Sequence, residues 1–287
     1  MRRRKIKKRS IFDMNRNKIN KNGKPEGEAE CLPRHIGIIM DGNGRWAKKR
    51  LLPRSVGHRF GAERMMGLLR HALDRGVAYV TVYALSTENF SRPEEELQGL
   101  FDLIRNRFVP CMREIAEKKA RVKVLGDLSL FPDDVRELLI RAQEETAAYT
   151  GRGVNVALGY GARAEIVRAA NIAVKEGRLL SEKEFSDLLY TGGQPDPDLI
   201  IRTGKELRLS NFLLFQSAYA ELYFSDKLFP DFSNRDLDAA IKDFAGRKRR
   251  FGKTDEQCGE EPEKTREDTG AGARGMGGDG AKGEENE

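Results

Sequence analysis

Residues 35–46 read His35-Ile36-Gly37-Ile38-Ile39-Met40-Asp41-Gly42-Asn43-Gly44-Arg45-Trp46, so a short apolar run passes directly into a polar loop with two glycines. The run His35–Met40 has the length of a strand, and its unbroken apolar character is typical of a strand buried on both faces. Such strands belong to parallel sheets that helices cover on both sides. The loop stands where ligands bind in these sheets, outside the carboxyl ends of the strands.

Outward from this segment, apolar runs of strand length alternate with longer stretches of helix length. Further strands are expected at Tyr79–Leu85, Val122–Leu125, Val154–Leu158, Leu199–Arg202 and Phe212–Phe215. Helices are expected at Arg59–Arg75, Pro93–Glu114, Pro132–Thr150, Arg163–Lys175, Glu182–Leu189 and Leu237–Arg250. This alternation implies an α/β protein with a mostly parallel central sheet flanked by helices. We expect a single domain at about residues 31–253.

The two ends of the chain differ from this middle in composition. Residues 1–30 carry eleven basic and four acidic side chains, and residues 254–287 carry four basic and eleven acidic ones with eight glycines. Both are predicted to be disordered tails. Their charges cancel, so the net charge of +7 belongs to the middle of the chain. A basic domain suits an anionic ligand, a nucleic acid or an anionic membrane surface.

Several classes of protein are disfavoured by the sequence. No apolar run approaches the roughly 20 residues that cross a bilayer, and the basic N-terminus lacks the apolar segment of a signal peptide. We therefore expect a cytoplasmic protein. The three cysteines and three histidines are scattered, without the spacing of a disulfide framework or a zinc site.

The loop after the first strand is the first candidate for chemistry. Gly42 and Gly44 let the backbone turn and present N–H groups to an anion. Arg45 offers a forked cation that matches phosphate oxygens. Asp41, at the strand end, is placed to hold Mg²⁺ that is bound to a diphosphate. An ordinary tight turn is the alternative, and this loop alone does not decide between the two.

Three more polar clusters stand at the ends of predicted elements. Arg54 and His58 are expected just before a helix, whose N-terminal amides favour anions. By spacing alone, however, a helix entry with a surface arginine and a partly buried histidine is the favoured explanation. Residues 86–93 follow the second strand, and helix capping by Ser91 accounts for only part of that cluster. Residues 202–211 follow the fifth strand and place three cations and two hydroxyls around one glycine, which is a good cradle for oxyanions.

A fifth cluster, residues 219–224, holds Glu221 within an apolar and aromatic run. Such a glutamate is either exposed, because side chains alternate along a strand, or buried, in which case the carboxylate requires a cation or a metal as its partner. Asp41 and Glu221 are therefore a candidate pair of Mg²⁺ ligands.

Taken together, the five clusters resemble the cis-prenyltransferase (undecaprenyl diphosphate synthase) family, and the likeness covers about residues 33–252. The segments that carry it are His35–Ala47, Gly57-His58, Tyr83–Pro93, Ile201–Gly204, Leu209–Leu214, Glu221–Phe224 and Arg247–Gly252. Five motifs in the same order make the resemblance specific, and it implies the α/β fold of that family.

The resemblance also implies a role for each matching residue. Asp41 is implied as the carboxylate that works with Mg²⁺, Asn89 as the residue assigned to proton removal, and Glu221 as a second metal carboxylate near a dimer interface. The implied allylic diphosphate loop and its neighbours are Gly42, Asn43, Gly44, Arg45, Trp46, Arg54 and His58. The implied turn that contacts the substrate and closes over it comprises Ser86, Thr87 and Glu88, with Phe90 and Arg92 as neighbouring substrate contacts. The implied isopentenyl diphosphate site comprises Arg202, Arg208, Leu209 and Ser210.

Two of these positions need comment. A carboxamide has no useful basicity at neutral pH, so we expect Asn89 to position substrate while the leaving diphosphate or Asp41 takes the proton. Leu207 stands where some members of the family carry a histidine that joins the metal, so that ligand is absent.

The implied reaction is the addition of isopentenyl diphosphate units to an allylic diphosphate, with Mg²⁺ as cofactor and a homodimer as the assembly. Ala84 is small, and in this family a small residue there accompanies a long product. This favours undecaprenyl diphosphate, made from farnesyl diphosphate. Because that product is a lipid, we also expect peripheral contact with the inner face of the membrane.

Three other functions fit the sequence less well. A trans-prenyltransferase requires an Asp-Asp-x-x-Asp motif, which the sequence lacks after Asp133-Asp134. A non-catalytic partner subunit usually loses the acidic and basic site residues, which are kept here. A nucleic-acid-binding module would use the basic domain and the Arg2–Arg9 run, but no binding motif accompanies them, and a solvated tail is the simpler interpretation.

Overall fold

The computed structural model describes residues 31–247, which belong to one compact unit. The predicted disordered tails, residues 1–30 and 254–287, lie outside the described residues, as does the predicted end of the domain at residues 248–253.

A six-stranded sheet in which every neighbouring pair is parallel forms the centre of the described residues, in the order β3-β4-β2-β1-β5-β6. The strands are β1 (His35–Ile39), β2 (Tyr79–Ser86), β3 (Arg121–Leu125), β4 (Gly153–Tyr160), β5 (Leu199–Arg202) and β6 (Glu221–Phe224). All residues of β1, β4 and β5 are buried, as the continuous apolar runs predicted, because helices or loops cover both faces. β6 alternates between half-buried and exposed residues because it is an edge strand.

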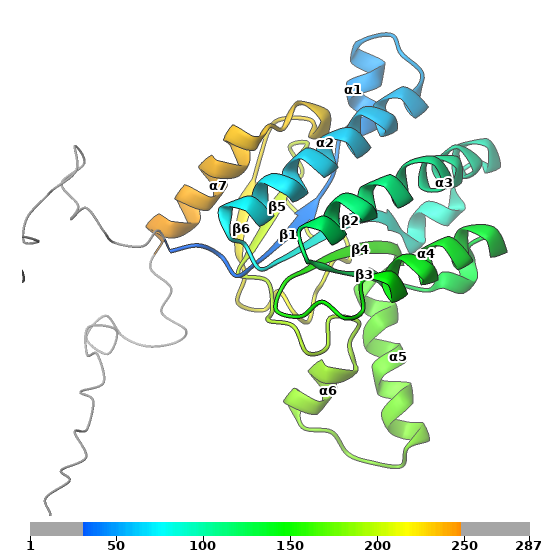
Figure 1. The fold of residues 1–287 in the computed structure, drawn as a ribbon, viewed down its shortest axis with the longest axis vertical. Coiled ribbons are helices and arrows are strands. Elements are labelled where there is room, and N and C mark those ends of the chain that lie inside the picture. The colour runs from blue at the N-terminus through cyan, green and yellow to red at the C-terminus, as the bar shows by residue number, and fades with distance from the viewer. Residues whose placement is uncertain (1–30, 248–287) are drawn as a thin grey trace, which may run out of the picture. The chain divides into compact units, whose positions relative to one another are not determined.

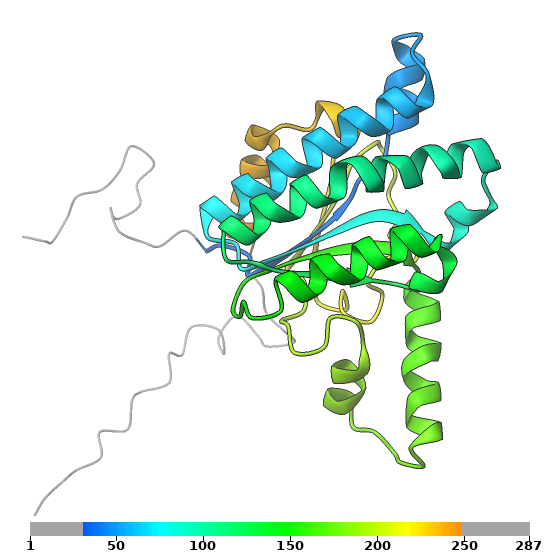
Figure 2. The same ribbon diagram turned by 45° about the vertical axis from the view of Figure 1, so that its right-hand side comes forward.

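Helices lie on both faces of the sheet. They are α1 (Asn43–Lys49), α2 (Arg54–Arg75), α3 (Glu94–Glu117), α4 (Asp133–Glu145), α5 (Ala162–Lys175), α6 (Glu182–Leu188) and α7 (Asn234–Gly246). Short 3₁₀ helices are η2 (Thr87–Ser91), η3 (Leu128–Leu130) and η4 (Phe229–Asp231). Figure 1 and Figure 2 show α7, α2, α3 and α4 side by side on one face, with α5 and α6 beyond the other. The predicted α/β class, with a parallel sheet flanked by helices, is confirmed.

The core has two parts, one on each face of the sheet. The larger lies under α2, α3, α4 and α7 and includes Leu69, Ile115 and Phe244. The smaller, on the opposite face, is built around Tyr160 and Phe212. The strands are thus fixed from both sides, which positions the loops at their carboxyl ends.

Two sequence predictions about the bounds of elements were wrong. The run Phe212–Phe215 is not a strand; it forms turns, because Ser210, Asn211 and Leu213 have positive φ values of 49°, 63° and 44°, which a strand excludes. The sixth strand is instead β6. Helix α2 begins at Arg54, five residues before the expected start, so Arg54 and His58 lie inside it.

Helix α1 was not predicted, because Gly42 and Gly44 suggested only a turn. Ser91 does not cap α3; its hydroxyl donates to the carbonyl oxygen of Glu88, and Pro93 precedes the helix. Within residues 31–247, no helix is long and apolar enough to span a bilayer.

Candidate active site

The carboxyl ends of β1 and β5 bring Asp41 and Arg202 together. These strands are neighbours, with Ile39 paired to Arg202, so the residue that ends β5 lies beside the loop that leaves β1. The Arg202 guanidinium donates to Asp41 Oδ2 at 3.0 Å, and Arg45 donates to Oδ1 at 2.9 Å. Each oxygen of this one carboxylate therefore accepts a charge-assisted hydrogen bond.

The backbone around Asp41 is built for close approach. Gly42 has a φ of 111°, and a Cβ there would lie 2.8 Å from a methyl of Leu228. Glycine is therefore required for both conformation and space. In α2, Gly57 and Gly61 face Asn43, and side chains there would collide with it. This pair of glycines lets α1 and α2 pack closely, which fixes α1 at the carboxyl end of the sheet, directly after β1.

The loop after β5 forms the other side of the site around Asp41. The Thr203 hydroxyl donates to the Asp41 carbonyl at 2.7 Å, which ties the two loops together. Arg202 also donates to the Ser210 hydroxyl at 2.7 Å and to the Arg208 carbonyl. Its side chain is only 4% exposed, and its Nε has no hydrogen-bond partner within the described residues. The Nε–H of Arg202 is thus an unsatisfied hydrogen-bond donor at this end of the sheet.

Glu206 lies between two arginines of this edge. Its carboxylate is 3.4 Å from Arg45 and 2.5 Å from Arg208. Both arginines were predicted to bind diphosphate, and here they share one carboxylate. Glu206 was missed as a site residue, because nothing in the loop's sequence distinguishes it from an exposed acid.

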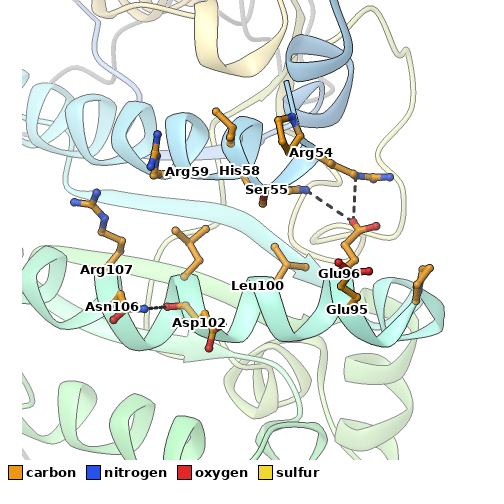
Figure 3. Close-up of a pocket in the computed structure, with 15 residues that line it drawn as sticks. Arg54, Ser55, His58, Arg59, Glu95, Glu96, Leu100, Asp102, Asn106 and Arg107 are labelled. Carbon is orange, nitrogen blue, oxygen red and sulfur yellow. Dashed lines mark hydrogen bonds and ion pairs between the residues drawn. The ribbon is translucent and has the colours of Figure 1, made fainter. Parts of the chain in front are cut away.

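A second glutamate gathers three more predicted residues at the junction of α2 and α3. One oxygen of Glu96 lies 2.9 Å from Arg92, 3.2 Å from Arg54 and 3.9 Å from His58. Figure 3 shows Arg54 of α2 facing Glu96 of α3. Glu96 also was missed, although its i, i+4 spacing from Arg92 was a usable signal.

The charge state of His58 follows from this neighbourhood. Burial, reinforced by Arg92 and Arg54 and opposed by Glu96, lowers the pKa of His58 to about 4. The imidazole is therefore neutral at physiological pH. Its Nε2 has no hydrogen-bond partner within the described residues. His58 can thus act as a neutral donor or acceptor toward a ligand, and not as a third cation.

The turn after β2 is held by its own side chains. Asn89 accepts the backbone N–H of Ser86 at 3.1 Å in a capping box. The amide of Asn211 donates to Glu88 at 3.0 Å, which links this turn to the loop after β5. With its oxygen used in this way, Asn89 shapes the turn, which agrees with a positioning role. Thr87 lines a separate cavity, next to Gly161.

Three other predicted residues have mainly structural contacts. Trp46 is 7% exposed and donates to Asp231 at 2.7 Å, with Phe60 and Arg50 against its ring. Phe90 packs edge-on against Phe131 at a centroid distance of 5.3 Å. Leu209 packs against the smaller core.

Cavities adjoin the cluster on both sides of His58. One of about 590 Å³ is lined by Asp41, Gly42, Asn43, Gly44, Arg45, Arg54 and Arg92, among others. Another, about 620 Å³, runs between α2 and α3 (Figure 3). A narrower space of about 100 Å³ borders both and has mostly apolar walls, including Met65, Ala84 and Phe108. Ala84 is exposed although β2 is a central strand, because it faces this space.

Glu221 is not brought to Asp41. It begins β6 level with Leu199, whereas Asp41 follows Ile39, which is level with the far end of β5. Its carboxylate instead accepts from Arg247 at 2.7 Å. The candidate Mg²⁺ pair is therefore not assembled within the described part of this chain.

The oxygen donors near Asp41 suit one mode of Mg²⁺ binding and not another. No group of three or more His, Cys, Asp or Glu side chains that could hold a metal occurs within residues 31–247. Mg²⁺ is usually bound through one or two carboxylates together with substrate phosphates and water. The partly exposed carboxylate of Asp41, which lies beside the guanidinium groups of Arg45 and Arg202, fits that mode and does not fit a metal held by protein alone.

Comparisons with known proteins show the family of this chain. The family model described as "Putative undecaprenyl diphosphate synthase" matches residues 39–252. An isoprenyl transferase of Neisseria gonorrhoeae is 46% identical over 231 residues, which cover 80% of this chain and 93% of that protein. A tritrans,polycis-undecaprenyl-diphosphate synthase (geranylgeranyl-diphosphate specific) of Methanopyrus kandleri is 48% identical over 231 residues, covering 77% and 85%.

Solved structures extend the likeness to the fold. Lavandulyl diphosphate synthase from Lavandula x intermedia, in complex with dimethylallyl diphosphate, aligns with a TM-score of 0.75 and 33% identity over 78% of this chain and 100% of that one. A probable undecaprenyl diphosphate synthase from Campylobacter jejuni aligns with a TM-score of 0.65 and 34% identity, covering 77% and 99%.

Proposed function

This chain belongs to the undecaprenyl diphosphate synthase family of cis-prenyltransferases, and we propose that it adds isopentenyl diphosphate units to farnesyl diphosphate to give undecaprenyl diphosphate. The observation that carries the proposal is the Asp41–Arg202 pair at the β1–β5 edge, with Arg45 and Arg208 beside it. A diphosphate requires several convergent cations and a carboxylate that tolerates a metal, and this edge supplies both.

The two diphosphates have separate places in this proposal. The allylic diphosphate binds in the cavity lined by Gly42–Arg45, to which α2 contributes Arg54 and the segment between η2 and α3 contributes Arg92. Isopentenyl diphosphate binds at Arg202, Arg208 and Ser210. Arg202 and Thr203, at the end of β5, both hydrogen-bond to Asp41 in the loop after β1. The two substrates therefore lie next to each other.

The reaction balances without an external reagent. The allylic C–O bond breaks and releases diphosphate, while the double bond of isopentenyl diphosphate attacks the allylic carbon to form a C–C bond. A proton then leaves, and the cis double bond forms. The arginines stabilise the charge that develops on the leaving diphosphate. Asn89 holds the turn in place, and the released diphosphate or Asp41 accepts the proton.

Mg²⁺ is proposed as the cofactor, with Asp41 as the residue of this chain that holds it together with diphosphate oxygens. When bound, the ion neutralises charge on those oxygens and thereby assists departure of the diphosphate. Glu221 is proposed as a second carboxylate that holds Mg²⁺ in a homodimer. Light scattering of the purified protein tests that assembly.

The growing hydrocarbon chain requires an apolar space beside the diphosphates. The narrow space between α2, α3 and the sheet meets this need, because Ala84 and Phe108 line it and His58 and Asn43 connect it to the diphosphate cavity. A larger residue at position 84 would shorten the space. The lipid product leads us to propose a cytoplasmic enzyme in peripheral contact with the inner face of the membrane.

The test is an incorporation assay with purified protein, Mg²⁺, radiolabelled isopentenyl diphosphate and either farnesyl or geranylgeranyl diphosphate, with products resolved by length. The proposal requires a long-chain product from farnesyl diphosphate that is lost in Asp41→Ala. Preference for the geranylgeranyl primer would change the primer assignment alone. No incorporation with either primer would reject the enzymatic role.

A further inference from the structure

The connection between α1 and α2 is an unusually exposed part of the described chain. All eight residues from Lys48 to Ser55 are exposed. Figure 1 and Figure 2 both show this connection and α1 extending past the carboxyl edge of the sheet, beyond the neighbouring helices. We call residues 48–55 the α1–α2 tip.

Leu51 lies at the point of the tip in a conformation that leucine avoids. Its φ is 56°, and its side chain is 95% exposed. It follows the C-cap Arg50, and the N–H of Leu52 bonds back to the carbonyl of Ala47 at 3.0 Å. Glycine is the usual residue at this position of a helix end, because it has no Cβ. A leucine here strains the backbone and gains no packing in return.

Charge around the tip has one sign. Residues 42–62 contain six lysines and arginines and no acidic residue. Arg50 and Arg54 pair with acids of other elements, Asp231 and Glu96. No ion pair involves Lys48 or Lys49 within residues 31–247, and both are exposed. The tip therefore presents an apolar point beside two unpaired cations.

The tip also borders the diphosphate cavity. Lys48, Leu51 and Leu52 line the same cavity as Asp41 and Arg45. An occupant of the tip would therefore lie at the entrance of the site. An apolar side chain flanked by lysines matches an anionic bilayer, where the apolar group enters the acyl region and the lysines meet lipid phosphates. An RNA would use the lysines but gives no reason for a strained, exposed leucine.

We propose that the α1–α2 tip docks on an anionic phospholipid bilayer by inserting Leu51, with Lys48 and Lys49 on the headgroups. The inference that the tip binds a bilayer depends on the exposure, strain and charge of the tip. Its use in passing product to the membrane rests on the proposed function. Docking would place the cavity mouth against the bilayer that receives the lipid.

The test compares full-length variants in co-sedimentation with phosphatidylcholine vesicles, with and without phosphatidylglycerol. Leu51→Gly removes the apolar group and relieves the strain, so its melting temperature should not fall. Its partition to anionic vesicles should drop about fivefold or more, and Lys48→Gln/Lys49→Gln should drop by a similar factor. Leu179→Gly is the matched control, since Leu179 is 98% exposed in the α5–α6 connection and should bind as wild type.

Insertion is measured directly with Leu51→Trp and vesicles of brominated lipid. Quenching beyond that of the wild type, whose single Trp46 is 7% exposed, supports insertion; Leu179→Trp should show none. Unchanged partition in Leu51→Gly, or no added quenching in Leu51→Trp, would overturn the proposal. Binding of the same variants to polyuridylate is measured in parallel. Variants that lose polyuridylate binding but keep vesicle binding would mark the tip as an RNA contact and would also overturn the proposal. A protein that inserts Leu51 yet transfers no prenyl group would refute only the proposed function.

Discussion

Polar side chains gather in two regions of the sheet, and they differ in how completely they are satisfied. Within the strands, Thr81 hydrogen-bonds both His35 and Asn155, and Asn155 also bonds Gln194 in the segment before β5; the second nitrogen of His35 contacts the Pro195 carbonyl at 2.7 Å. At the carboxyl edge, by contrast, Arg202 Nε, His58 Nε2 and Asn43 Oδ1 are buried and have no hydrogen-bond partner among residues 31–247.

The difference separates structure from function. A buried network in which each polar group has a partner stabilises the fold and leaves nothing for a ligand. The carboxyl edge holds its cations with carboxylates that a diphosphate can replace, Glu96 and Glu206, and leaves three buried atoms for new bonds. Substitutions in the first region should change stability, and substitutions in the second should change binding and turnover.

The largest effect is expected for Arg202→Gln, which removes the buried partner of Asp41. Turnover should fall about 10²–10³-fold, because the buried cation that positions isopentenyl diphosphate and Asp41 for the reaction is lost. Steady-state incorporation of isopentenyl diphosphate measures it. Arg168→Gln is the matched control: its Nε is also buried without a partner, but it stacks on Tyr190 away from this edge. Equal losses in both variants would erase the distinction between the regions.

Thr81→Val tests the other region. The hydroxyl of Thr81 contacts both His35 and Asn155, so its loss leaves two buried groups unpaired. The free energy of unfolding should fall by about 1–3 kcal/mol, while KM for isopentenyl diphosphate stays unchanged. Urea unfolding and steady-state kinetics on the same preparation give both values. A raised KM with unchanged stability would contradict the assignment.

The same region predicts how stability depends on pH. Burial lowers the pKa of His35 from 6.5 to about 4, against the smaller opposing effect of its bond to Pro195. The unfolded chain therefore binds the proton more readily, so stability is full above pH 6.5 and is lost as pH falls toward 4. Between pH 7 and pH 5 His35 should account for about 2 kcal/mol of lost stability. His35→Gln should reduce that pH dependence, as followed by urea midpoints at each pH.

The smallest effect is expected for Glu96→Gln, which removes the acid that Arg54 and Arg92 share. Inorganic pyrophosphate should then bind about 3–10-fold more tightly, because it no longer competes with an internal carboxylate. Titration calorimetry measures the change. Glu95→Gln, one residue away and exposed, changes the net charge equally and should have no effect. Weaker binding in Glu96→Gln would mean that Glu96 positions the arginines for the ligand.

Much of this was readable from the sequence, for physical reasons. The strands β1 and β5 were found because both are buried on all sides, which leaves a continuous apolar signal. The run at Phe212 gave the same signal but belongs to turns, because residues with positive φ bury it against the smaller core. Apolar runs report burial, and they report a strand only when the backbone is extended.

The site was predicted in the same uneven way. Asp41, Arg45 and Arg202 were found because they follow strands whose ends meet. Glu96 and Glu206 were not, because their partners come from other segments and a single acid in a charged stretch has no pattern. Nor does the sequence show that Glu221 and Asp41 lie at opposite ends of β5. Glu221 is paired with Leu199 at the start of that strand, whereas Asp41 lies near its end, and only the strand register decides this.

Binding of isopentenyl diphosphate tests most directly whether the carboxyl edge is a diphosphate site. Titration calorimetry would compare wild type, Arg208→Ala and Thr81→Val; Arg208 is 62% exposed, so its loss should not harm folding. We predict that affinity falls about tenfold or more in Arg208→Ala and is unchanged in Thr81→Val. Equal affinity in all three proteins would contradict the assignment of this edge to the substrate.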